Sequence, residues 1–149
     1  MMKRQIIFVS GIFPPDIGGP ATYISDIAQY LGRIGFKVQI VTLGEKVETY
    51  ALDHQVIVHK IKRNQNKMIR SIRVTSKIIQ LCDNRTILFA NTLLMEASMA
   101  KTITSRPIVY KIVGDYAWEY FKNKNRFKSQ RRSKTNIHDR FGMGRHTIH

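Results

Sequence analysis

Residues 5–44 read QIIFVSGIFPPDIGGPATYISDIAQYLGRIGFKVQIVTLG, and they contain the pattern that indicates the fold class. It opens with an apolar run, residues 6–9, that is typical of a strand covered on both faces. A loop rich in Gly and Pro follows. The next apolar residues recur at helical spacing: Ile24, Ile27, Ala28 and Leu31. A second β-branched run covers residues 38–43. Strand, loop, helix and strand in this order predict a βαβ unit on a parallel sheet.

The same alternation continues along the chain. Residues 55–61, 86–90 and 107–113 are expected to form the third, fourth and fifth strands. Helical patterns over residues 67–82 and 93–103 separate them. Right-handed crossovers then place the loops after the first, fourth and fifth strands along one carboxyl edge, where such sheets bind ligands. The sequence therefore predicts an α/β fold with a Rossmann-like, doubly wound and mainly parallel sheet.

The net charge of +15 is concentrated near the end of the chain. Residues 1–121 carry 16 Lys and Arg against 9 Asp and Glu, whereas residues 122–149 carry 9 against 1. The second segment has few aliphatic residues and no period, so it cannot bury enough apolar surface to offset the cost of ordering it. We therefore predict a folded domain over residues 1–121 and a basic tail, disordered or non-native, over residues 122–149.

Two further totals bear on the compartment. No run of residues is apolar enough to cross a bilayer. A single cysteine, Cys82, excludes an internal disulfide framework and a cysteine-built metal site. The simplest setting for one free thiol is reducing, so a cytoplasmic location is expected, with peripheral contact at the inner membrane surface as an extension.

The loop DIGGP, residues 16–20, is the first candidate site. Gly18 and Gly19 allow the backbone to approach a ligand closely, and Pro20 suits the first position of a helix. Free N–H groups at a helix start, together with the positive end of the helix dipole, favour phosphate or another anion. The loop has neither the Walker A pattern nor GxGxxG. A glycine turn that merely joins strand to helix is therefore an equal alternative.

Two stretches carry a resemblance to a known family. Residues 13–44 resemble the opening of family 4 glycosyltransferases, in which a (Y/F)PP-x-x-GG loop follows the first strand and an LxxxGHxV helix end precedes the second. Residues 109–121, VYKIVGDYAWEYF, are similar to a GD-x-x-WE turn in a bacterial branch of that family. This chain departs from the pattern at Phe36 and at Val113, where relatives often carry His.

The resemblance implies a retaining GT-B enzyme that transfers a sugar from a nucleoside diphosphate sugar to a glycan or lipid-linked acceptor. It implies that Gly18 and Gly19 bind the donor diphosphate. It assigns Asp115 a catalytic place facing the reacting sugar, and it places Trp118 and Glu119 on the acceptor side. Without the family, Asp115 is an Asx-turn residue and Trp118 a core residue.

The resemblance also implies that half of the enzyme is missing. The family's second domain supplies a basic pair and E-x7-E carboxylates, and nothing after residue 121 matches it. We therefore expect a truncated or frame-shifted N-terminal, acceptor-side domain that is inactive alone. No cofactor and no metal site are expected.

A basic helix face and the basic tail leave a second class of function open. Four basic residues share one face of the helix expected over residues 67–82: Lys67, Arg70, Arg73 and Lys77. This face is either solvated or in contact with anionic lipid headgroups. The alternative function is a non-catalytic basic module for nucleic acid or an anionic membrane. Nucleic acid is disfavoured, because the tail offers only Phe127 and Phe141 for base stacking.

Overall fold

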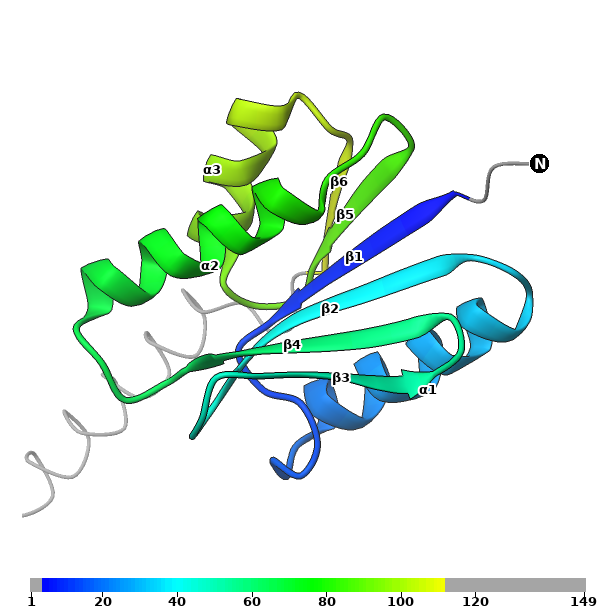
Figure 1. Cartoon of the computed structure of the whole chain (residues 1–149), viewed down its shortest axis with the longest axis horizontal. Helices are drawn as coiled ribbons and strands as arrows, with labels where there is room; N and C mark the ends of the chain where they lie inside the picture. The colour runs from blue at the N-terminus through cyan, green and yellow to red at the C-terminus, as the bar shows by residue number, and fades with distance from the viewer. Residues whose placement is uncertain (1–3, 112–149) are drawn as a thin grey trace, which may run out of the picture. The chain divides into compact units, whose positions relative to one another are not determined.

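Six strands form one sheet in the order β3-β4-β2-β1-β5-β6, with three helices around it (Figure 1). The computed structural model describes residues 4–111, and all structural statements concern that part of the chain. The strands are β1 Gln5–Ser10, β2 Lys37–Gly44, β3 Glu48–Asp53, β4 Val56–Lys62, β5 Thr86–Ala90 and β6 Ile108–Tyr110. The helices are α1 Gly19–Arg33, α2 Lys67–Leu81 and α3 Leu94–Thr104. The predicted α/β fold with a mainly parallel sheet is confirmed.

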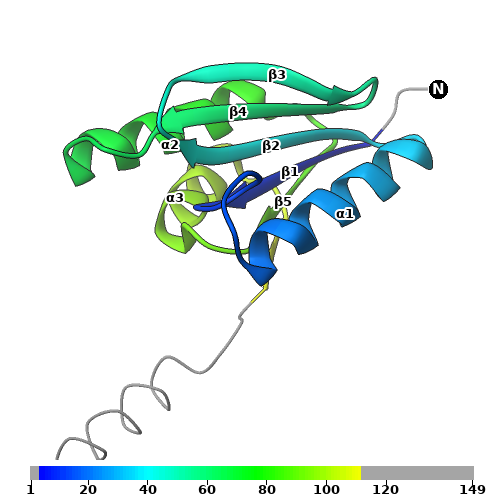
Figure 2. The same cartoon turned by 90° about the horizontal axis from the view of Figure 1, so that it is seen from below.

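The helices cover both faces of the sheet, and each face has its own core (Figure 2). On one face α1 packs against β1, β2 and β4 through a cluster of eight buried residues: Phe8, Phe13, Ile24, Ala28, Val38, Ile40, Val56 and Val58. On the other face α2 and α3 pack through Val74, Ile78, Ala97 and Ala100. Burying apolar side chains on both faces requires nearly continuous apolar strands, as residues 6–9 and 38–43 have.

The α1 helix begins and ends at residues suited to those places. Pro20 lies in its first turn, where the missing N–H would have had no helical partner. After the last turn Gly35 adopts a φ of +98°, in the left-handed region that side chains avoid. The chain therefore turns back directly into β2.

One strand was missed by the sequence prediction, and one is shorter than predicted. The edge strand β3 is mostly exposed and pairs with β4 in the antiparallel direction, so its sequence carries no apolar signal. The fifth expected strand, 107–113, appears as the shorter β6, and its end lies outside the described residues. The predicted domain boundary after residue 121 and the predicted tail also lie outside them. Within residues 4–111, no helix is both long and apolar enough to cross a bilayer.

Candidate functional site

The sheet has a topological switch point between β1 and β5. From β1 the chain passes through α1 to β2 on one side, and from β4 it returns through α2 to β5 on the other side. Both neighbours of β1 are parallel to it. In doubly wound sheets, ligands bind outside the carboxyl ends of the strands at this point. The residues that follow β1 and β5 are therefore the expected location of a ligand site.

Three polar residues lie side by side at or near the carboxyl ends of three neighbouring strands. Ser10 of β1 is paired in register with Thr42 of β2. The Asn91 N–H donates to the Val9 carbonyl at 3.0 Å, which continues the β1–β5 ladder by one residue and places Asn91 beside Ser10. All three are buried, with exposed fractions of 0%, 0% and 5% for Ser10, Thr42 and Asn91. We call Ser10, Thr42 and Asn91 the polar row.

The polar row lies on the α1 side of the sheet. Side chains alternate between the two faces of a strand. Phe8 and Phe89, two residues before Ser10 and Asn91, pack in the cluster beneath α1. The polar row therefore continues that apolar cluster at the carboxyl edge, on the face that α1 covers.

Two members of the polar row have side-chain atoms without a partner among residues 4–111. The Ser10 hydroxyl donates to the Ile12 carbonyl at 2.8 Å. Within the same range, the Thr42 hydroxyl oxygen and both polar atoms of the Asn91 amide make no hydrogen bond. An unpaired buried polar group costs about 1–3 kcal/mol, so native proteins pair nearly all of them. Asn91 can both donate to and accept from a ligand, and Thr42 can do the same.

The loop between β1 and α1 brings Gly18 and Gly19 to the same edge. A Cβ on Gly18 would lie 3.2 Å from Cδ1 of Ile12, so the Ile12 side chain would have to shift by a few tenths of an ångström to admit it. A Cβ on Gly19 would have no heavy atom within 4 Å. Within the described residues the Gly19 N–H has no hydrogen-bond partner, and it stands at the positive end of the α1 dipole. The predicted diphosphate role of both glycines stays a prediction.

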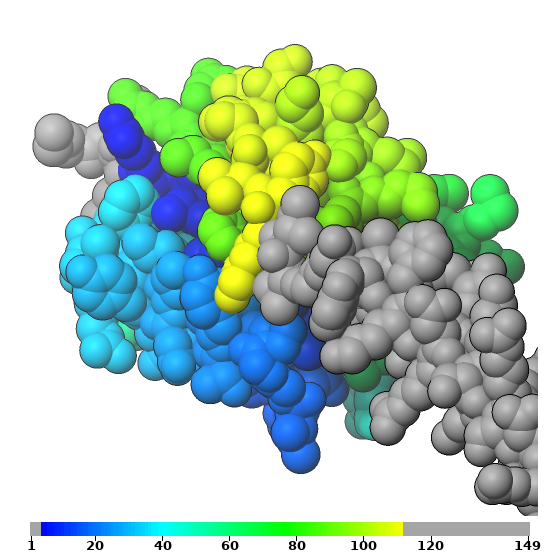
Figure 3. Space-filling view, turned by 180° about the vertical axis from the view of Figure 1, so that it is seen from behind, coloured from blue at the N-terminus to red at the C-terminus, as the bar shows by residue number. Residues whose placement is uncertain are grey.

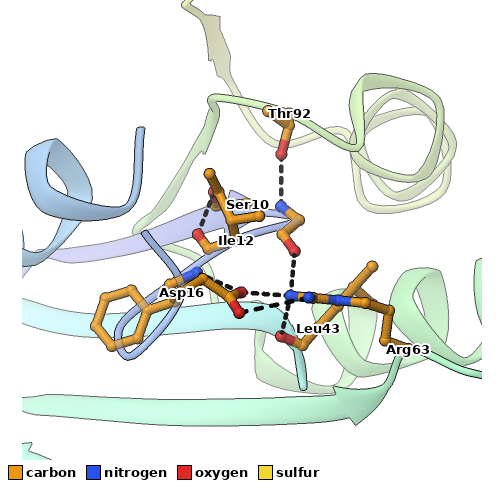
Figure 4. A network of polar contacts seen from close by, with 8 residues as sticks. Ser10, Ile12, Asp16, Leu43, Arg63 and Thr92 are labelled. Atoms are coloured by element: carbon orange, nitrogen blue, oxygen red, sulfur yellow. Dashed lines mark hydrogen bonds and ion pairs between the residues drawn. The ribbon is translucent and has the colours of Figure 1, made fainter. Parts of the chain in front are cut away.

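Arg63, which follows β4, fastens this loop to the sheet (Figure 4). Its guanidinium donates to the carbonyls of Gly11 and Leu43, each at 3.2 Å, and forms an ion pair with Asp16. The hydrogen bond from Arg63 is the main reason why the pKa of Asp16 lies below its usual value. On the other side of the loop, the Gly11 N–H donates to the Thr92 hydroxyl. The loop is therefore tied both to β4 and to the segment after β5.

A cation stands beside the polar row. The Lys111 N–H donates to the Ala90 carbonyl at 2.8 Å, and its ammonium lies 3.0 Å from the centre of the Tyr23 ring on α1. Figure 3 shows the yellow end of β6 next to the blue surface of α1. A positive charge thus accompanies the helix start at the carboxyl edge. Neither Arg63 nor Lys111 was singled out from the sequence, although each directly follows a strand.

The other predicted site residues cannot be placed against this edge. Asp115, Trp118 and Glu119 lie outside the described residues, so their roles stay predictions. The groups that the structure does bring together are hydroxyls, an amide, backbone N–H groups and an ammonium. Such groups bind and orient a ligand.

The chain was compared with known proteins. No family model and no curated protein matches it. Among solved structures, a similar fold occurs in the crystal structure of the C-terminal domain of a hydrogenase from Pyrococcus furiosus, with a TM-score of 0.49 and 17% sequence identity over 75% of this chain and 95% of that domain. A likeness of this size carries no argument about the activity of the chain, and we take no hydrogenase chemistry from it.

These findings correct the family prediction. No family model and no curated protein connects the chain with family 4 glycosyltransferases, and the solved structure named above is not described as one. The predicted sugar transfer is therefore wrong, as are the partners predicted from it, a nucleoside diphosphate sugar and a glycan or lipid-linked acceptor. The findings give no support to the lipid contact expected for the basic α2 face either.

Proposed function

We propose that the chain is a binding domain for a small phosphorylated ligand, held at the switch point between β1 and β5. The observation that carries the proposal is the buried amide of Asn91, which has no partner in the described part of the chain although it lies beside the carboxyl end of the central strand. A polar ligand would supply that partner, and burial would strengthen the hydrogen bond.

The anionic end of the ligand belongs at the start of α1. The Gly19 N–H is unpaired within the described residues, and the helix dipole favours negative charge there. The Lys111 ammonium adds a full positive charge, which the Tyr23 ring holds against α1. The polar row would then bind the uncharged part of the ligand. No cofactor is required for this function, and a cytoplasmic location remains our expectation.

Titration calorimetry on the full chain tests the proposal with inorganic phosphate, pyrophosphate and adenosine monophosphate. We expect all three to bind, and the nucleotide most tightly, since only it offers groups for the Asn91 amide. Lys111→Gln should weaken phosphate binding about fivefold, the factor that corresponds to about 1 kcal/mol. Lys37→Gln is the matched control, because it removes the same charge from an exposed lysine at the opposite edge of the sheet.

Asn91→Leu separates the two halves of the site. It should leave phosphate binding within about twofold while reducing the preference for the nucleotide about tenfold, as expected for one lost buried hydrogen-bonding group. Absence of heat with all three compounds at concentrations up to about 10 mM, the range of the weakest specific sites, would overturn the proposal. Equal loss of phosphate binding in Lys111→Gln and Lys37→Gln would overturn it as well.

A further inference from the structure

A second feature lies away from the carboxyl edge, in a groove between α2 and α3. Its volume is about 430 Å³, and its floor and walls are mainly apolar: Met68, Ser71, Ile72, Met95, Glu96 and Met99. Three of these side chains are strongly exposed, with fractions of 74% for Met68, 59% for Ile72 and 70% for Met95. Exposed apolar residues that are contiguous over two helices indicate an interaction surface.

The rim of this groove is positively charged. Lys67 and Arg70 of α2 also line it, and α2 has no acidic residue. The one acidic residue of the groove, Glu96, accepts a hydrogen bond from the Ser71 hydroxyl at 2.9 Å. Within residues 4–111, the ion pairs are Lys60 with Glu48 and Arg63 with Asp16, so the α2 cations take part in none of them. A partner for this groove should therefore be acidic as well as apolar.

Charge argues against two candidate partners for this groove that belong to the same protein. Residues 122–149 of the same chain carry 9 Lys and Arg against 1 Asp or Glu, so they would be repelled. A second copy of the chain would place the same basic rim against itself in a two-fold dimer, which like charges oppose. Neither occupant supplies the negative charge that the rim requires.

We propose that the α2–α3 groove docks an amphipathic helix of a partner protein, with apolar side chains in the groove and acidic residues along its flanks. Helices of this kind place residues at i, i+3, i+4 and i+7 into such grooves. Methionine lines both walls, and its unbranched side chain adapts to different apolar surfaces. A concave groove receives the projecting side chains of a helix, whereas a flat bilayer surface cannot fill it.

Fluorescence anisotropy on the full chain tests this inference with a labelled peptide of about 18 residues, the length of five helical turns, that has a Leu stripe and Glu flanks. Two control peptides carry Lys in place of Glu, or the same composition in scrambled order. We expect the acidic amphipathic peptide to bind and the two controls to bind at least tenfold more weakly. Lys67→Glu should weaken the acidic peptide and strengthen the basic one.

Matched surface variants test whether the peptide binds in the groove. Ile72→Glu and Met95→Glu should each weaken the peptide at least tenfold. Tyr30→Glu should leave it unchanged, since Tyr30 is as exposed as Ile72, at 59%, but lies on α1 across the sheet. Failure of the acidic peptide to bind, or equal losses in all three variants, would overturn the proposal. A second outcome would also overturn it: the peptide does not bind, while the chain binds vesicles with about 30% phosphatidylserine and loses this binding in Met95→Glu. A membrane would then be the occupant of the groove.

Discussion

Replacing an unpaired buried group of the polar row by an apolar one should make the ligand-free protein more stable. In Thr42→Val, a methyl group takes the place of a hydroxyl that is fully buried and makes no hydrogen bond to any described residue. Leaving such a group unpaired costs about 1–3 kcal/mol, so the free energy of unfolding should rise by that amount. Asn91→Leu should act in the same direction, because two unpaired atoms are removed at similar volume. A site selected for binding at the expense of stability behaves in this way.

Urea unfolding followed by circular dichroism measures the effect. With a slope of about 1–3 kcal/mol per M, as is typical of small domains, the midpoint should rise by roughly 1 M. Ser10→Ala is the matched control in the same row, because the Ser10 hydroxyl is bonded to the Ile12 carbonyl and its removal should destabilise by about 0.5–1.5 kcal/mol. If Thr42→Val lowered the midpoint as Ser10→Ala does, the hydroxyl would have a partner in solution and the reasoning would fail.

Three further outcomes are expected. Arg63→Gln removes the partner that lowers the pKa of Asp16. The Asp16 carboxylate stabilises the fold above about pH 4, and this stabilisation is lost as the pH falls through its lowered pKa. The drop in urea midpoint between pH 5 and pH 3 should therefore be smaller in the variant than in the unchanged protein. Burial lowers the pKa of His59, so the folded state favours the neutral imidazole. The free energy of unfolding should therefore decline as the pH falls below about 6.5. His59→Gln should remove this decline from urea midpoints measured between pH 7.5 and pH 5.5. Gly35→Ala should lower the free energy of unfolding by about 1 kcal/mol in the same assay, since φ is +98° there, while no change would mean that the turn relaxes.

The sheet was predictable because its central strands are apolar on both faces, as in residues 6–9 and 38–43. The exposed edge strand β3 was not, since its stability comes from pairing with β4 rather than from burial. Ser10 and Asn91 are visible in the sequence as polar residues that end an apolar run, whereas Thr42 lies within one. Their position side by side follows only from the strand order, which brings Asn91 next to Ser10 from 81 residues away.

The family resemblance misled for a physical reason. The glycines and prolines that carried it have local tasks in this fold. Gly18 makes room for Ile12, and Pro20 begins a helix. Any tight strand-to-helix connection with such packing favours these residue types. A short glycine-rich loop therefore reports the path of the backbone and does not identify the chemistry beside it.

The central place of β1 determines the order in which the sheet can assemble during synthesis. As the first strand to be made, it can pair with β2 once α1 and residues 37–44 have followed. Its other neighbour, β5, is 81 residues away in the chain, as the bond between Gln5 and Thr86 shows. One edge of β1, with its unpaired backbone N–H and C=O groups, therefore stays open until most of the domain has emerged. Folding dominated by such distant pairings is slow, and the nascent chain should depend on chaperones during that interval.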